Sequence, residues 1–101
     1  MNKTKIMNLL TICRKAAKLT TGFDSVKESL MDGSAELVLL TGDVSPKTEK
    51  EIRFFADKKN IAVLKTDISM EEMYGGIGKK AAVMSVCDKG FAEKFTELAS
   101  E

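Results

Sequence analysis

The amino-acid sequence predicts an α/β protein, a three-layer α/β/α sandwich with a mixed sheet of about four strands. Short apolar runs of strand length, at Leu37–Leu40, Ile61–Leu64 and Ala81–Val86, alternate with stretches of helical periodicity. Continuous apolar runs are typical of strands covered on both faces, so helices are expected on both sides of the sheet. The length of 101 residues leaves room for one domain, which we assign to residues 1–101.

The first third of the chain predicts a helix, a strand and a second helix. Apolar side chains recur at i, i+3, i+4 and i+7 through Lys3–Lys18, and Cys13 falls on that stripe as a small buried residue. Leu19–Thr21 follows as a short edge strand. A second helix is expected over Asp24–Asp32, because Gly33 supplies the left-handed residue at which helices stop.

Three further helices are expected between and after the apolar runs. Ser45 caps a helix that ends near Lys59, where a cation suits the carbonyl end of the helix dipole. Ser69, followed three residues later by an acid, forms a capping box that begins a short helix. Gly75–Gly76 are expected to end that helix, and Asp88 caps the last one.

Composition excludes several classes of function. Histidine is absent, so His-based triads, His-ligated zinc and imidazole catalysis are ruled out. Cys13 and Cys87 lie far apart and belong to no CxxC motif, which excludes a disulfide framework and a four-cysteine metal site. The net charge of +1 means that any basic surface must be local, and the first twenty residues carry five bases and no acid.

No catalytic constellation is visible, so we expect a protein without catalytic residues, metal ligands, cofactor or small-molecule substrate. No hydroxyl has a histidine base, and the glycine-rich run before Ala81 lacks the residues of a phosphate loop: Met73 stands where Gly is needed and Lys80 where Ser or Thr is needed. No signal peptide or membrane span is apparent, so a cytoplasmic protein without a membrane partner is expected.

Three loops remain as candidate binding sites. Gly22 precedes a helix, so its backbone can approach a ligand closely, and the free helix amides favour an anion beside Asp24 and Ser25. Taken alone, this stretch is more simply explained as an ordinary capped helix. A third candidate, Lys47, lies at another helix start, where simple capping also accounts for the residues.

The second candidate loop is flexible and basic. It carries Ile77, Gly78, Lys79 and Lys80, so it offers one apolar side chain and two cations. The plain alternative is a helix-to-strand connection with solvated lysines.

At these residues the sequence resembles the kink-turn RNA-binding ribosomal protein superfamily (the L-seven-Ae type), and more narrowly its small bacterial members. The resemblance covers nearly the whole chain and depends on the order and spacing of several segments. They are Lys18–Gly22, Gly33, Ala35–Leu40, Asp43–Lys50, Ile77–Lys79 and Asp88–Ala92.

The resemblance implies roles for named residues. Gly22 would approach the RNA backbone, and Asp24 and Ser25 would occupy the positions that read guanine edges at sheared G·A pairs. The family commonly has Lys at the position of Glu28, and the nearest base, Lys27, is one residue away, a rotation of about 100° on a helix.

The second contact that the resemblance implies is the loop before the last strand. That loop is apolar in many members, whereas here Lys79 and Lys80 make it basic. The short fourth helix departs as well, because Met73 matches the frequent Leu of the family but Tyr74 replaces its Gly.

We therefore expect a non-catalytic protein that binds structured, kink-turn-like RNA and is associated with the ribosome or translation. Its expected partner is structured RNA, ribosomal RNA among the candidates, and a monomer suffices. The alternative is a protein-interaction module on the same fold with weakened or lost RNA binding. That alternative is motivated by Glu28 and the near-neutral charge, with Phe54 and Tyr74 as candidate contact residues.

Overall fold

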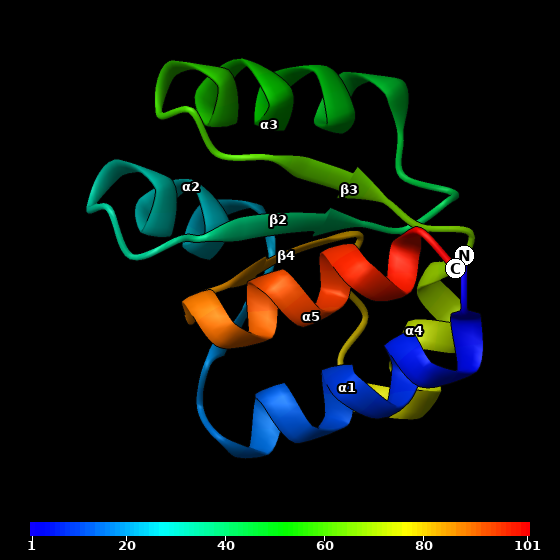
Figure 1. Cartoon of the computed structure of the whole chain (residues 1–101). Helices are drawn as coiled ribbons and strands as arrows, with labels where there is room; N and C mark the ends of the chain where they lie inside the picture. The colour runs from blue at the N-terminus through cyan, green and yellow to red at the C-terminus, as the bar shows by residue number, and fades with distance from the viewer.

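Helical periodicity and short apolar runs alternate along the chain, and the computed structural model, which describes residues 1–101, follows that alternation (Figure 1). It contains five helices and four strands. In chain order they are α1 (Lys3–Lys15), β1 (Leu19–Thr21), α2 (Phe23–Met31), β2 (Leu37–Leu40), α3 (Pro46–Lys58), β3 (Val63–Lys65), α4 (Met70–Ile77), β4 (Val83–Val86) and α5 (Lys89–Ala99).

The sheet is mixed and has four strands, as the sequence predicted, and their order is β1-β4-β2-β3. β2 pairs with β3 in parallel, whereas β4 is antiparallel to both β1 and β2. Strands β1, β2 and β3 therefore point the same way. The expectation that Ile61–Leu64 is a fully covered strand is wrong, because β3 lies at an edge of the sheet and covers Val63–Lys65 with only partial burial.

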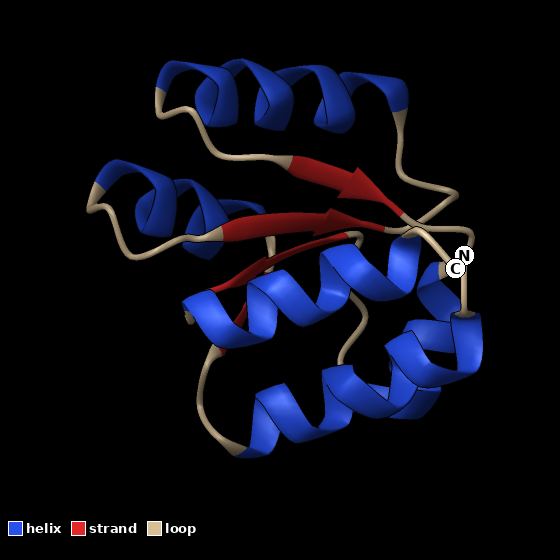
Figure 2. Cartoon of the chain, viewed as in Figure 1, coloured by secondary structure: helices blue, strands red, loops and turns tan.

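Helices cover both faces of the sheet, which confirms the three layers (Figure 2). Strand β2 shows the division, since Leu37 and Leu39 pack under α1, α4 and α5 while Val38 and Leu40 pack under α2 and α3. This alternation is the period of two that a pleated strand imposes. Phe95 of α5 is fully buried in the larger of the two cores.

Helix α1 ends three residues earlier than its periodicity predicted. Ala17 adopts a left-handed conformation with φ of +59°, and the amide of Lys18 then donates to the carbonyl of Cys13. This left-handed stop turns the chain toward β1.

Helix α4 continues through the two glycines that were expected to end it. The Thr11 hydroxyl of α1 donates to the Gly76 carbonyl at 3.3 Å, and a Cβ on Gly76 would collide with the Met7 side chain. The glycine therefore serves close packing of α1 against α4. The helix ends instead at Gly78, which is left-handed with φ of +71°.

Candidate nucleic-acid interface

The loops that the sequence singled out lie at one edge of the sheet, where β1, β2 and β3 have their carboxyl ends. Because β1, β2 and β3 are codirectional and β4 runs against them, the carboxyl ends of three strands meet the start of the fourth. Backbone hydrogen bonds join these loops: Gly22 donates to Val83 at 2.9 Å, and Thr41 donates to Ala82 at 3.0 Å. Helices α2, α3 and α4 follow β1, β2 and β3 in the chain, so each begins on the side of the sheet where those strands end (Figure 1).

Gly22 presents open backbone at this edge. It has φ of +97° and ψ of 152°, a conformation that side chains disfavour, and a Cβ built there would meet nothing within 4 Å. The side chains of Asn2, Ser45, Ser69 and Asp88 cap the other four helices, whereas α2 has no side-chain cap. The amides at the first turn of α2 are therefore free to meet an anion.

Asp24 and Ser25 lie on that first turn and are both exposed. The structure thus brings Gly22, Asp24 and Ser25 to one surface. Lys27 does not join them, because its ammonium lies 4.6 Å from the ring centroid of Phe55, in the second half of α3. The neighbouring Glu28 is exposed as well.

The basic loop adjoins Gly22 through the Gly22–Val83 hydrogen bond. Lys79 and Lys80 are exposed and form no ion pair, and Gly78 turns the chain toward β4. Ile77 is placed differently from the expectation of an accessible apolar side chain. As the last residue of the extended α4 it is 1% exposed and packs in the core, so its side chain is not part of the surface.

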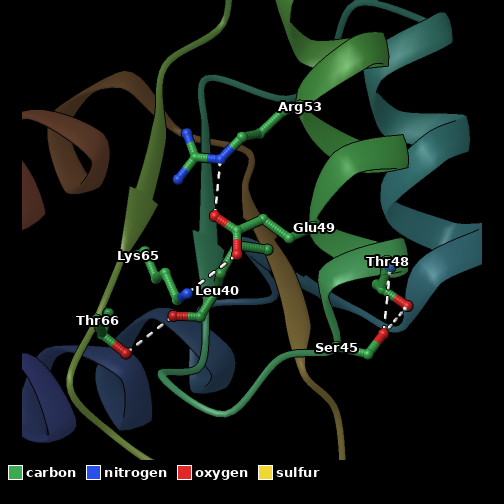
Figure 3. Close-up of polar contacts among 7 residues, drawn as sticks. All are labelled: Leu40, Ser45, Thr48, Glu49, Arg53, Lys65 and Thr66. Atoms are coloured by element: carbon green, nitrogen blue, oxygen red, sulfur yellow. Dashed lines mark hydrogen bonds and ion pairs between the residues drawn. The ribbon is translucent and has the colours of Figure 1, made fainter.

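The start of α3 is capped in the ordinary way, with Lys47 exposed beside the cap. The Ser45 hydroxyl accepts the Thr48 amide at 3.2 Å and donates to the Thr48 hydroxyl at 2.9 Å (Figure 3). Simple capping thus accounts for this stretch, and Lys47 contributes a cation near the edge.

Sequence reasoning missed a cluster of charges beside this helix start. One Glu49 oxygen accepts Lys65 Nζ at 3.0 Å, and the other accepts Arg53 Nε at 2.9 Å (Figure 3). The contact with Lys65, and then that with Arg53, lowers the pKa of Glu49. The Glu49–Arg53 pair has a readable i, i+4 spacing, but Lys65 comes from β3 and no local pattern signals it.

The ends of β2 and β3 are held together by Thr66. Its hydroxyl donates to the Leu40 carbonyl at 2.9 Å (Figure 3), and its amide donates to the same carbonyl at 2.9 Å. At the end of β2 the fully buried Thr41 hydroxyl forms no hydrogen bond of good geometry. It nevertheless lies near the carboxylate of Asp43, and its proximity, together with the Met70 amide, lowers the pKa of that carboxyl.

None of the helices combines the length and the hydrophobicity that a membrane span needs. The polar edge, formed by Gly22, Asp24, Ser25, Lys47, Lys79 and Lys80, combines open amides with exposed hydroxyl and carboxylate groups and lysines that form no ion pair.

Comparison with known proteins places this geometry in a family. The family model described as "Ribosomal protein L7Ae/L30e/S12e/Gadd45 family" matches residues 4–96. RNA-binding protein YlxQ of Enterococcus faecium is 30% identical over 97 residues, covering 96% of this chain and 93% of that protein. RNA-binding protein YlxQ of Bacillus subtilis (strain 168) is 34% identical over 91 residues, covering 89% of this chain and 90% of the relative.

A solved structure agrees with the fold. A protein of unknown function from Bacillus halodurans C superposes with a TM-score of 0.90 over 100% of both chains, at 27% identity. The segment that the family model matches, residues 4–96, runs from α1 into α5 and so includes the whole polar edge of the sheet. On this evidence the chain belongs to the ribosomal protein L7Ae/L30e/S12e/Gadd45 family.

Proposed function

We infer that this protein is a non-catalytic RNA-binding protein that recognises structured, kink-turn-like RNA at the polar edge of its sheet. The observation that carries the inference is the uncapped start of α2. The open backbone at Gly22 and the free amides of α2 lie next to β4, the strand that follows the lysine loop, because the Gly22 amide donates to the Val83 carbonyl. Family membership and the names of the two relatives, both RNA-binding proteins, support the same class of ligand.

Each part of the edge has a distinct task in this proposal. The amides of α2 and the cations Lys79 and Lys80 meet phosphate, which positions the RNA without reading its sequence. Asp24 and Ser25 meet base edges, which a kink or bulge exposes and a regular A-form helix hides. Lys47 adds charge from the start of α3.

The negative charge of Asp24 repels the phosphates of a bound RNA, so we expect weaker binding than with an uncharged side chain at this position. Asp24→Asn keeps the size of the side chain and removes the charge. We expect this variant to bind RNA more tightly than the wild type, as measured by the dissociation constant. A weaker complex would show that the carboxylate itself accepts hydrogen bonds from the RNA.

The direct test is a gel shift that compares a kink-turn RNA with a straight duplex of the same length. We expect the kinked RNA to bind more tightly, and Ser25→Ala to reduce that preference. Equal affinity for both RNAs would refute kink recognition. RNA crosslinking and sequencing from cells would then identify the partner, with ribosomal RNA among the expected results, and sedimentation would test the expected monomer.

A protein-interaction role is the second candidate, because four large apolar side chains are about half exposed. Ile12 is 55% exposed, Met31 57%, Phe54 56% and Tyr74 49%. They lie on four different helices, α1, α2, α3 and α4. Capture of partners from lysate with and without RNase separates the two candidates, since partners bridged by RNA disappear after digestion.

A further inference from the structure

Strand β3 has a free lateral edge, because β2 is its only neighbour in the sheet (Figure 1). The Ala62 carbonyl and the Thr66 amide both bond to β2, at 3.0 and 2.9 Å. Since the bonding groups of a strand alternate between its two sides, Val63 and Lys65 direct their amides and carbonyls away from β2. A row of such groups is a template for one more strand.

This free edge lacks the usual protection against pairing. Proteins blunt exposed edges with proline or with charged side chains. Ile61–Leu64 contains neither, and the ammonium of Lys65, the only charged group in β3, contacts Glu49 at 3.0 Å. Ile61 and Val63 are only partly buried, although their apolar run is typical of a covered strand. The sequence of β3 therefore fits a strand with a neighbour on each side.

A hollow of about 510 Å³ lies between α3 and the free edge of β3. Its apolar lining is formed by Phe54, Ile61 and Val63, and Phe54 is 56% exposed. Every second side chain of an added strand would point toward this hollow. We propose that the free edge of β3 binds an extended, acidic segment of a partner protein as a fifth strand, with apolar side chains in the hollow and a carboxylate at its rim.

The charges around the hollow indicate the kind of segment. The lining residues and the side chains joined to them by ion pairs or cation–π contacts include four cations and two acids. They are Lys50, Arg53, Lys58 and Lys65 against Glu49 and Asp57. A second copy of β3 would bring another lysine and no acid to this rim. RNA has no strand backbone to pair with β3, so an acidic polypeptide fits this surface best.

The inference does not depend on the RNA-binding function proposed above. The strands β1 and β3 are the two opposite edges of the sheet, with β4 and β2 between them. Three strand spacings separate them by about 14 Å, so β3 is remote from the surface formed by Gly22, Asp24 and Ser25. Binding at one place is expected to leave the other open.

A synthetic peptide of nine residues is the probe for this edge. It has threonine at the odd positions and valine and glutamate in turn at the even ones, so valine and glutamate share one face when it is extended. We expect it to shift the amide resonances of Val63 and Lys65 until saturation and to slow their hydrogen exchange. The Gly22 amide, at the other edge of the sheet, should not change. The same peptide with lysine in place of glutamate should bind at least about 2- to 5-fold more weakly.

Three variants test the parts of the site. Phe54→Ala should weaken binding of the glutamate peptide roughly tenfold, because it removes the apolar wall of the hollow. Tyr74→Ala is the matched control, since Tyr74 is 49% exposed on α4 and does not line this hollow; this variant should bind like the wild type. Lys50→Glu removes a cation that forms no ion pair, so it should reduce the preference for glutamate over lysine without loss of the fold.

Several outcomes would overturn the proposal. Unchanged Val63 and Lys65 amides at millimolar peptide, or equal binding of the two peptides, would refute an acidic strand at this edge. Equal affinities of the Phe54→Ala and Tyr74→Ala variants would exclude the hollow. If these amides shift with protein concentration alone, a second copy occupies the edge, and if kink-turn RNA or a straight duplex shifts them, RNA does. Loss of RNA binding with peptide binding intact would refute only the RNA-binding function.

Discussion

Replacing Gly22 with alanine tests the structural basis of the candidate interface. A Cβ at this position meets no atom within 4 Å, so the substitution creates no clash. The cost comes from the backbone, because φ of +97° and ψ of 152° belong to a region that essentially only glycine occupies, at about 1–3 kcal/mol for other residues. The lower entropy of the unfolded alanine chain offsets about 0.4–1 kcal/mol of this.

The expected net effect of Gly22→Ala is a loss of about 1–2 kcal/mol in the free energy of unfolding. For a chain of this size it lowers the melting temperature by roughly 5–15 °C. The added methyl group also occupies the open space in front of α2. If it removes one charge-assisted hydrogen bond from an amide to a phosphate, RNA affinity falls by roughly 10- to 100-fold.

Gly33→Ala provides the matched control. Gly33 also has positive φ, +83°, and open space around its Cα, but it follows the other end of α2, more than about 13 Å from Gly22. We expect it to lower stability by about 1 kcal/mol and to leave RNA affinity unchanged. Thermal melts followed by circular dichroism, and gel shifts well below both melting temperatures, measure the two effects.

Two results would refute this reasoning. An unchanged melting temperature for Gly22→Ala would contradict the backbone conformation assigned to Gly22. An equal loss of RNA affinity in the Gly22 and Gly33 variants would show that lost stability, and not the open face of α2, weakens the complex.

Three further outcomes are expected. Replacing Lys79 and Lys80 with alanine should make the slope of log affinity against log salt shallower by roughly 1–2, for kinked and straight RNA alike; an unchanged slope would remove that loop from the interface. Contact with the Lys3 ammonium, and then the Ser69 amide, lowers the pKa of Glu72 from 4.5 to about 2, so its stabilisation is full above pH 4.5 and is lost as the pH falls toward 2. Lys3→Ala should raise that pKa in a carboxyl NMR titration, and no change would refute the contact. Phe95→Ala should cost about 3–5 kcal/mol in urea unfolding because the ring is fully buried; a loss below about 1 kcal/mol would contradict its place in the core.

Local signals in the sequence were sufficient for most elements of the fold. The Ser69–Glu72 capping box has both of its hydrogen bonds, at 3.1 and 3.0 Å, and Gly33 follows α2 with positive φ. Strands β1 and β2 have the predicted limits. These features depend on residues that are close in the chain, which is why the pattern alone identifies them.

The sequence-based predictions were wrong where contacts between residues far apart in the chain determine the structure. Gly76 stays helical because Met7 and Thr11 of α1 pack against it, and this moves Ile77 from the expected loop into the core. Similarly, the Glu49–Lys65 ion pair joins residues 16 positions apart on different elements. Periodicity and capping rules describe only residues that are close in the chain, so they do not predict such pairs. The sequence therefore gives the number of charges at the edge but not which charges pair with each other.

The hydrogen bond from the Gly22 amide to the Val83 carbonyl has a consequence for the dynamics of the edge. β1 has only three residues, lies at an edge of the sheet and pairs only with β4, so it can open locally without breaking the pairs between the other strands. Such an opening breaks this bond and separates the start of α2 from the lysine loop. Protection of the Gly22 amide from hydrogen exchange therefore measures how often the two halves of the candidate site part, on a scale between zero and the full free energy of unfolding.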